Sequence, residues 1–246
     1  MIRLSGVYKA FAGRPVLDGL SLDIPEGQTT VILGHSGSGK SVTLKLIVGL
    51  LTPDAGVVEV DGSVVHELEP DALAAMRGTI GYVFQFAALF DSMTVAENLR
   101  LGLARRGLPE PDVADRIRES LELVGLLAAA DRYPAELSGG MRKRAGIARA
   151  IALRPRYILY DEPTTGLDPV TSASIDQLMV RTRDLGATGV VVTHDLRSAF
   201  TVGDRIAMLY QGRIRQTGTV AEMQASDDPV VRQFLEGRPD PVEATV

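Results

Sequence analysis

The sequence contains no cysteine. A disulfide scaffold and a metal site built from thiolates are therefore excluded, and nothing in the composition opposes a cytoplasmic location. No apolar run reaches the roughly 18–20 residues that a membrane-spanning helix needs. The opening residues, 1–5, lack the apolar core of a signal peptide. If the protein serves a membrane, we expect it to act from the cytoplasmic side and through partners.

The chain also lacks the positive charge of a nucleic-acid-binding protein. Lysine and arginine number 26 against 31 aspartates and glutamates, which gives a net charge of −5. This balance argues against nucleic acid as the main partner. No internal repeat, low-complexity segment or long linker is present, and 246 residues can bury a sizeable core.

Short apolar runs alternate with helical patterns along most of the chain. Runs typical of strands occupy residues 2–9, 16–24, 29–33, 57–60, 80–84, 157–160, 190–193, 206–210 and 213–216. Helical spacing occupies residues 41–50, 71–77, 112–124, 138–153 and 170–185, and Thr94 with Glu97 forms a capping box for another helix. Apart from the opening strands, the alternation predicts an α/β fold with a largely parallel sheet and helices on both faces. We expect one domain over residues 1–236, with a helical insertion over about 90–150 and a polar tail over 237–246.

The strongest local signal is Gly-His-Ser-Gly-Ser-Gly-Lys-Ser at residues 34–41, between a predicted strand and a predicted helix. It matches the P-loop template Gly-x4-Gly-Lys-Ser/Thr, in which glycines let backbone N–H groups point at phosphate oxygens. Lys40 would neutralise phosphate charge, and Ser41 would be a ligand of Mg²⁺. The ring of His35 is expected to be incidental, because the backbone binds at that position. The sequence therefore predicts an ATP site lined by Gly34, His35, Ser36, Gly37, Ser38, Gly39, Lys40, Ser41 and Val42.

Two carboxylates end a second apolar strand, in Tyr-Ile-Leu-Tyr-Asp-Glu at residues 157–162. A P-loop needs an acidic residue to order the metal and a group to orient the attacking water. Asp161 fits the first role as a Mg²⁺ ligand. Glu162, one residue on, would point differently and accept a proton from the water.

The order of further motifs resembles a known family. Leu-Ser-Gly-Gly at residues 137–140 precedes a basic helix, and Asp-Glu-Pro at 161–163 follows further along the chain. This arrangement is similar to the ATPase cassette of ABC transporters over residues 1–236. The resemblance implies a P-loop NTPase cassette with a RecA-like core sheet, an antiparallel β subdomain and a helical subdomain. It also implies an enzyme that hydrolyses ATP with Mg²⁺.

The resemblance assigns a role to each matching position. Gln85 would contact Mg²⁺ and sense the membrane partner, and His194 would be the switch histidine. Asp168 lies in the D-loop, and Phe11, with Tyr8 as the alternative, would stack on adenine beside Val16. The catalytic set is then Lys40, Gln85, Glu162 and His194. Ser138, Gly139 and Gly140 would close over the γ-phosphate held by a second cassette, which implies a homodimer with two ATP molecules.

Departures from the usual motifs indicate a subfamily. The family's signature begins with Leu-Ser-Gly-Gly, here residues 137–140, and Met141 stands at the fifth position, where glutamine is usual. In the D-loop, Gly166-Leu167 stands before Asp168 where Ser-Ala is usual. Together with the segments at 84–93 and 228–235, these residues resemble the ATPase subunits of Mla (maintenance of lipid asymmetry) and Mce-associated systems. That resemblance implies a multi-spanning permease that moves phospholipid or another hydrophobic substrate, and an Mce-domain lipid-binding protein. The ATPase would be peripheral, on the cytoplasmic face of the inner membrane.

Other interpretations remain at this stage. An ATPase subunit of a polar-solute importer of the amino-acid type is the alternative, because those subunits also end soon after the last helix. DNA-repair relatives carry long or zinc-bearing insertions, and translation factors carry two cassettes, so neither fits. Phe86, Leu89, Phe90 and Met93 form either the core of the helical insertion or a groove for a short permease helix. Residues 237–246 are either a frayed end or a tail that grips the second cassette.

Overall fold

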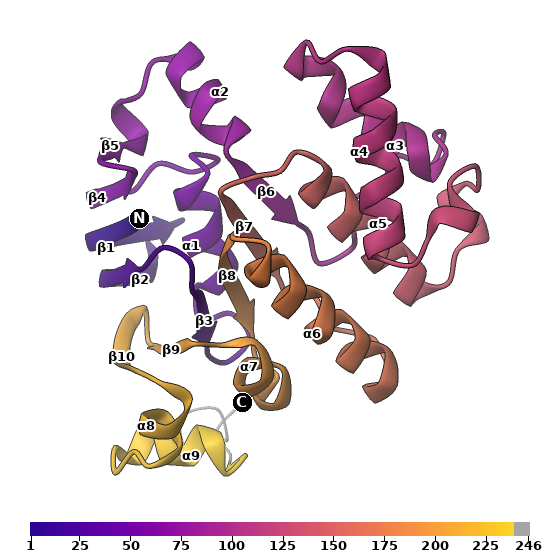
Figure 1. The fold of residues 1–246 in the computed structure, drawn as a ribbon. Helices are drawn as coiled ribbons and strands as arrows, with labels where there is room; N and C mark the ends of the chain where they lie inside the picture. Colours follow the sequence, from indigo (N-terminus) through magenta and orange to yellow (C-terminus); the bar gives the residue numbers. More distant parts are fainter. Residues whose placement is uncertain (239–246) are drawn as a thin grey trace. The chain divides into compact units, whose positions relative to one another are not determined.

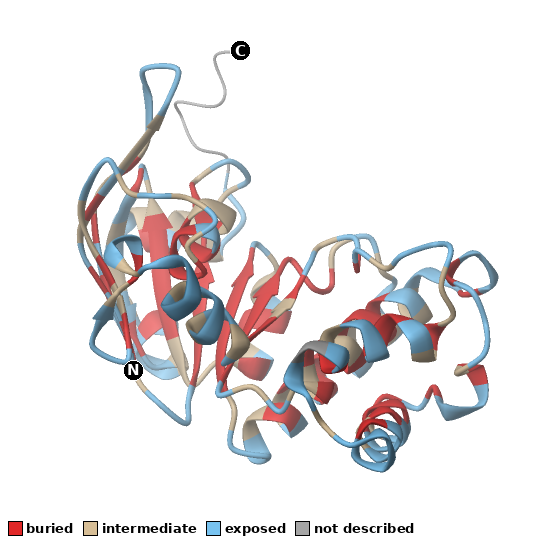
Figure 2. Ribbon diagram, turned by 90° about the horizontal axis from the view of Figure 1, so that it is seen from above, coloured by how far each residue is buried: buried red, intermediate tan, exposed pale blue. Residues whose placement is uncertain are grey.

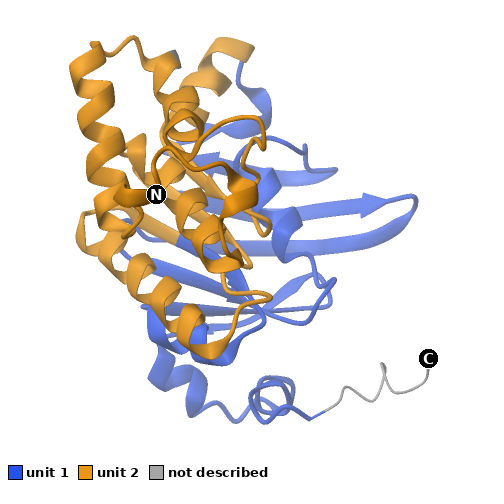
Figure 3. Ribbon diagram, turned by 90° about the vertical axis from the view of Figure 1, so that its right-hand side faces the viewer, with its two compact units in different colours: residues 1–69, 190–246 blue, residues 70–189 orange. Residues whose placement is uncertain are grey.

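The computed structural model describes residues 1–238 and divides the chain into two compact units (Figure 1, Figure 3). Unit 1 comprises residues 1–69 and 190–246, blue in Figure 3, and unit 2 comprises residues 70–189, orange in the same view. The predicted tail at 237–246 lies almost entirely outside the described residues.

Unit 1 contains a four-stranded antiparallel sheet with the strand order β2-β1-β4-β5. Its strands are β1 (Ile2–Phe11), β2 (Arg14–Ile24), β4 (Ala55–Val60) and β5 (Ser63–Val64). β1 and β2 run closer to their turn than the sequence pattern predicted, because Ala12 and Gly13 both adopt positive φ. Two residues in this conformation are enough to reverse the chain between antiparallel strands.

One glycine is required where β4 approaches β1. Gly56 has φ +82°, and a Cβ at this position would lie 2.1 Å from the carbonyl oxygen of Gly6. Gly62 has a similar φ of +80° but open space around it, so it is a matched control. We expect Gly62→Ala to cost about 1 kcal/mol from the strained φ alone, or roughly 2–4 °C in melting temperature. Gly56→Ala should cost several times more, and thermal melts that rank the two variants equally would contradict this packing argument.

A second set of strands in unit 1 contains buried strands and one partly exposed edge strand, β10 (Arg213–Gly218). β3 (Thr29–Leu33) runs parallel to β9 (Arg205–Tyr210), and β9 forms an antiparallel hairpin with β10. The strand order is β10-β9-β3, with β8 (Thr188–Thr193) on the other side of β3. Every residue of β3 and β8 is buried, as Figure 2 shows in red. This parallel core confirms the predicted sheet type.

Helices of unit 1 lie against these strands. α1 (Lys40–Ile47) follows β3, and α7 (Leu196–Val202) packs on β3. α8 (Val220–Gln224) packs on β9 and β10, and α9 (Pro229–Leu235) packs on α8. The sequence pattern did not predict α7 or α8. Both are shorter than the window over which helical periodicity can be recognised, and side-chain caps at Asp195 and Thr219 define where they begin.

Unit 2 holds one pair of parallel strands and a group of helices. β6 (Ile80–Val83) pairs with β7 (Tyr157–Asp161) in parallel register. α5 (Gly139–Ala152) is central to the helices, because it contacts β6 and three other helices. The helices of this unit are α2 (Pro70–Gly78), α3 (Val95–Leu103), α4 (Glu110–Leu123), α5 and α6 (Pro169–Asp184). Thr94 and Glu97 form the predicted capping box at the start of α3.

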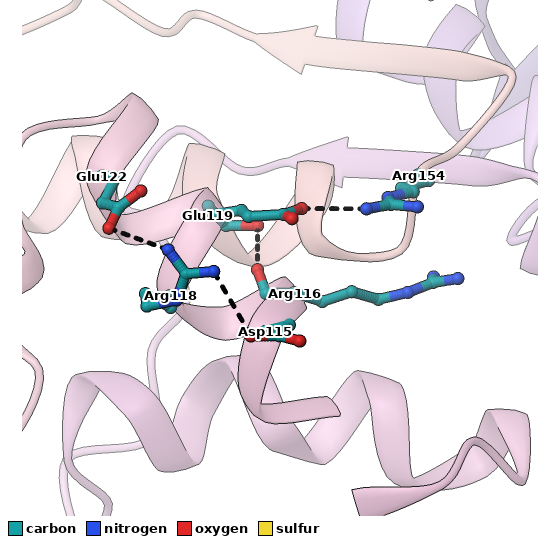
Figure 4. Close-up of polar contacts among 7 residues, drawn as sticks. Asp115, Arg116, Arg118, Glu119, Glu122 and Arg154 are labelled. Carbon is teal, nitrogen blue, oxygen red and sulfur yellow. Dashed lines mark hydrogen bonds and ion pairs between the residues drawn. The ribbon is translucent and has the colours of Figure 1, made fainter. Parts of the chain in front are cut away.

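The outer face of α4 carries ion pairs, whereas its inner face is apolar. Arg118 lies between Asp115, at 3.3 Å, and Glu122, at 3.2 Å, one helical turn apart on either side (Figure 4). Glu119 receives a hydrogen bond from Arg154 at 2.8 Å, beyond the end of α5. The opposite, buried face places Val113, Ile117 and Leu121 on the side that packs against α5. Across the described residues, no helix is long and apolar enough to cross a membrane.

Candidate functional site

The loop that the sequence predicts to bind phosphate lies between β3 and α1 in unit 1, and it is called the phosphate-binding loop from here on. Gly39 caps the helix in a left-handed conformation with φ 105°, so α1 begins at Lys40. The Lys40 side chain is buried, and its Nζ donates to the carbonyl oxygens of Gly34 at 2.8 Å and His35 at 2.9 Å. The backbone N–H of Ser38 donates to the same His35 oxygen at 3.2 Å. The lysine therefore lies folded back over its own loop, where its charge faces the position that phosphates would occupy.

Three features of this loop fit a nucleotide with its metal ion. A Cβ on Gly34 would lie 2.5 Å from the carbonyl oxygen of Leu209, and one on Gly39 would lie 2.7 Å from a methyl carbon of Leu17. Both positions thus need glycine for the loop to keep its course. The hydroxyl of Ser38 is buried, and within the described chain it has no hydrogen-bond partner, which a phosphate oxygen would supply. Ser41 follows in the first turn of α1, as a Mg²⁺ ligand of a P-loop must.

The remaining site residues predicted for this unit have different surroundings. Val16 packs against the loop, since its Cγ1 lies 3.3 Å from the position of a Cβ on Gly39. Phe11 and Tyr8 are both exposed on β1, at 42% and 44%, so either ring is accessible to a planar base. His194 is exposed directly after β8, and Asp195 next to it caps α7.

Unit 2 carries the two carboxylates, Asp161 as the last residue of β7 and Glu162 immediately after it. Both are nearly buried, at 7% and 8% exposure. Glu162 has a left-handed φ of 48°, which is uncommon for a side chain of this size and turns the chain sharply at the strand end. Thr165 Oγ1 donates to Glu162 Oε2 at 2.9 Å. The Glu162 carboxylate is thus bound within the turn that follows β7.

Two residues around these carboxylates were missed by the sequence analysis. Tyr82 on β6 donates its hydroxyl to Asp161 Oδ2 at 3.0 Å, and burial together with the Asp161 charge raises the pKa of this phenol. Lys143 on α5 donates to the Glu162 carbonyl oxygen at 3.2 Å, and burial lowers the pKa of its ammonium although Glu162 and Asp161 oppose that shift. The available signal for Lys143 was a lysine in helical phase with apolar Ile147 and Ala150.

The start of α5, which carries the signature residues 138–140, and the start of α6, which follows the D-loop residue Asp168, pack on each other within unit 2. Ser138 caps α5 by accepting a hydrogen bond from the N–H of Met141 at 3.3 Å. Asp168 caps α6 and also accepts a 2.5 Å hydrogen bond from the Thr171 hydroxyl, which is the main cause of its lowered pKa. A Cβ on Gly140 would lie 2.5 Å from the Thr171 methyl carbon. Gly140 is therefore required for this close approach, and Gly139 lies beside it at the helix start.

The segment after β6 contains Gln85 and the loop 86–93, which presents exposed aromatic rings. Phe86 is 86% exposed and Phe90 is 51% exposed. Ala87 and Ala88 between them adopt left-handed conformations with φ 60° and 48°. The Arg149 guanidinium on α5 donates to the carbonyl oxygens of Ala87, at 3.0 Å, and Ala88, at 2.5 Å, and burial lowers the pKa of this arginine.

The far end of the same loop is held by Asn98 of α3. Its side chain is fully buried and exchanges hydrogen bonds with the backbone N–H and C=O of Phe90, at 2.7 and 3.1 Å. Its amide also donates to the carbonyl oxygens of Met93 and Thr94. The aromatic rings at 86 and 90 are thus displayed on a loop whose backbone is fixed at both ends. These two rings do not lie in the core of the helical insertion, which is one of the two predicted alternatives, whereas Leu89 and Met93 are half-buried.

The predicted residues divide between the units as follows. Unit 1 carries Phe11, Val16, residues 34–42 and His194, and unit 2 carries Gln85, Ser138, Gly139, Gly140, Asp161, Glu162 and Asp168. His66, which is in none of these sets, is exposed on a short 3₁₀ helix.

Comparison with known proteins identifies the family. The family model described as "ABC transporter" matches residues 17–165. A probable ribonucleotide transport ATP-binding protein of Mycobacterium leprae is 42% identical over 239 residues, which is 96% of this chain and 69% of that protein. The methionine import ATP-binding protein MetN of Caulobacter vibrioides is 43% identical over 241 residues, 96% of this chain and 72% of that one. The chloroplastic protein TRIGALACTOSYLDIACYLGLYCEROL 3 of Arabidopsis thaliana is 38% identical and covers 98% of this chain and 74% of its own.

A solved structure agrees with the sequence relatives. An ATP-binding cassette determined as a dimer in a post-hydrolysis state with ADP and Pi is 35% identical. It covers 89% of this chain and 99% of its own, with a TM-score of 0.82. The antiparallel sheet, the parallel strands and the helices described above are those of this cassette fold. The chain belongs to the ABC transporter family and is an ATP-hydrolysing, ATP-binding subunit of such a transporter.

Proposed function

We propose that the chain works as a Mg²⁺-dependent ATPase whose hydrolysis drives a membrane permease that moves phospholipid or another hydrophobic substrate. Lys40 and the N–H groups of residues 34–42 bind the phosphates, and Ser41, Gln85 and Asp161 hold Mg²⁺. When bound, Mg²⁺ neutralises charge on the phosphate oxygens. Glu162 accepts the proton of the attacking water, and His194 contacts the γ-phosphate. The hydroxyl of Ser38, which is buried and has no hydrogen-bond partner among the described residues, supports this assignment, as does the glycine-dependent course of the loop.

The active form is a homodimer in which each signature completes the site of the other copy. Ser138, Gly139 and Gly140 at the start of α5 face the γ-phosphate bound by the second chain, and Asp168 lies beside them. The close packing of Gly140 on Thr171 supports a fixed relation between signature and D-loop. The dimeric state of the related cassette with ADP and Pi supports the same stoichiometry.

The observation that carries the coupling to a permease is the loop 86–93. Phe86 and Phe90 are 86% and 51% exposed on a backbone that Arg149 and Asn98 fix, and an exposed apolar patch of this kind marks a surface that a partner covers. A short amphipathic helix of a multi-spanning permease would lay its apolar face on these rings. The chain would then be peripheral, on the cytoplasmic face of the cell membrane.

The proposal that the substrate is hydrophobic rests on three features that resemble Mla- and Mce-associated ATPases. They are the segment 84–93, Met141 in the signature, and the segment 228–235. The name of the Arabidopsis relative, which is that of a glycolipid, supports the same class. The alternative is an importer of a polar solute of the amino-acid type, which the MetN relative favours. The two proposals predict different partner proteins and no difference in ATP chemistry.

An affinity pull-down of the tagged full chain from native membranes, analysed by mass spectrometry, separates them. A multi-spanning permease recovered together with an Mce-domain protein would support lipid transport. A permease recovered with a binding protein for polar solutes would overturn the lipid assignment and leave the ATPase in place.

A substitution in the loop tests the docking surface in the same experiment. We expect Phe86→Asp to reduce permease recovery at least tenfold, because a charge would be buried against an apolar helix. ATP binding by the variant should be unchanged. Leu185→Asp is the matched control, since Leu185 is also strongly exposed, at 73%, and lies after α6. Equal permease recovery by both variants would show that the loop is not the docking surface.

A further inference from the structure

The ring of His35 has a partner that its position in the phosphate-binding loop did not suggest. It meets the ring of Phe234 on α9 edge to face, with centroids 4.7 Å apart and planes at 85°. This is the favoured geometry for two aromatic rings, and such pairs contribute beyond the area that they bury. The C-terminal helix therefore touches the loop through side chains that are 199 positions apart in number, 35 and 234.

His35 is a central residue of the loop's own hydrogen bonding. Its carbonyl oxygen accepts from both the Lys40 ammonium, at 2.9 Å, and the Ser38 N–H, at 3.2 Å. The neighbouring Ser36 and Gly37 are exposed, and Gly37 has a left-handed φ of 79°. The loop thus has little other side-chain packing at its tip, and the ring contact restricts the residue on which Lys40 rests.

α9 is itself firmly placed in unit 1. Asp228 caps it by accepting from the N–H groups of Val230 and Val231, at 2.9 and 3.2 Å. The same carboxylate forms an ion pair with Arg215 of β10 at 2.8 Å. Val231 is fully buried. A fixed helix can therefore position a loop residue that contacts it.

We propose that Phe234 is a positioning residue for nucleotide binding, which acts through His35 and makes α9 sensitive to the nucleotide. The contact holds the backbone of the loop in the conformation that binds phosphate. Less conformational entropy is therefore lost when the nucleotide binds. By reciprocity, a nucleotide that fixes the loop also stabilises α9. The inference rests on the proposed role of the P-loop in ATP binding.

The test uses the full chain and a fluorescent ATP analogue with Mg²⁺. We expect Phe234→Ala to weaken binding about threefold to tenfold, the range for one aromatic pair, and Phe234→Tyr to restore it. His35→Ala should weaken binding equally, and the double variant should be no weaker than either single one. Arg232→Ala is the control, because Arg232 is exposed on the same helix and pairs with Glu236 on the surface.

Hydrogen exchange supplies a readout that a merely structural contact would not change. ATP should slow amide exchange across residues 229–235 in the wild type, and His35→Ala should abolish that effect. If Phe234→Ala unfolds α9, nucleotide binding and hydrogen exchange in the His35→Ala variant test the proposal without it. Binding within twofold of the wild type in both single variants, with no nucleotide effect on α9, would overturn the proposal. A wild type that binds no ATP would instead overturn the proposed function.

Discussion

Glu162→Gln should lower ATP turnover about 10²- to 10⁴-fold while ATP binding persists. The substitution keeps the shape of the side chain, so Thr165 can still donate its 2.9 Å hydrogen bond to the retained oxygen. The backbone at 162, which accepts from Lys143 and has its φ of 48°, is also unaffected. What is lost is the basic oxygen that, in the proposed mechanism, takes the proton from water. ATP-bound dimers should therefore accumulate.

Phosphate release and size-exclusion chromatography with ATP measure these two effects. Glu69→Gln is the control, because Glu69 is exposed and precedes α2. Turnover near that of the wild type in Glu162→Gln would remove Glu162 as the base. Loss of ATP binding in the same variant would show that the residue supports the fold of the site and not the chemistry.

Lys40→Ala should weaken ATP binding about 10- to 100-fold, the range for one lost charge-assisted interaction of 1.5–3 kcal/mol. The variant loses the positive charge that is proposed to face the phosphates. It also leaves the carbonyl oxygens of Gly34 and His35 without the ammonium that they share. Two effects thus act in the same direction, one on the bound state and one on the order of the loop.

Titration with a fluorescent nucleotide measures the loss of affinity. Lys45→Ala is a close control, because Lys45 lies on the same helix with its side chain exposed. A loss of affinity as large in Lys45→Ala as in Lys40→Ala would indicate a general charge effect. An unchanged affinity in Lys40→Ala would contradict the P-loop assignment.

The loop over residues 34–39 between a strand and a helix could be predicted because its motif is contiguous in the sequence. The strands at 29–33, 157–160 and 190–193 could be predicted for a similar reason, since buried parallel strands are continuous apolar runs. Tyr82 could not be assigned to Asp161, because that hydrogen bond depends on the register of β6 against β7, which no local pattern encodes. The contact of His35 with Phe234 could not be predicted either, because no local pattern relates two residues so far apart in the sequence.

Arg149 and Asn98 show what kind of signal was present but ambiguous. Asn98 lies in helical phase with the buried Val95 and Leu99, so a polar residue on an apolar face was visible in the sequence. Its partners were not visible, because they lie in the loop before the helix. Arg149 belonged to a basic helix in which any one of several arginines could have been the buried one.

The contact of α5 with the loop 86–93 also constrains how these positions can change over generations. The φ of 48° at Ala88 is strained for a residue with a Cβ but not for glycine, so the protein can accept Ala88→Gly. Gly146 is not free in the same way, because a Cβ there would lie 3.3 Å from both Cα and Cβ of Ala87. A lineage that replaces Ala87 with glycine first removes one of those contacts and makes Gly146→Ala easier to accept. We therefore expect substitutions at positions 87 and 146 to occur in a preferred order, because the effect of the second depends on the first.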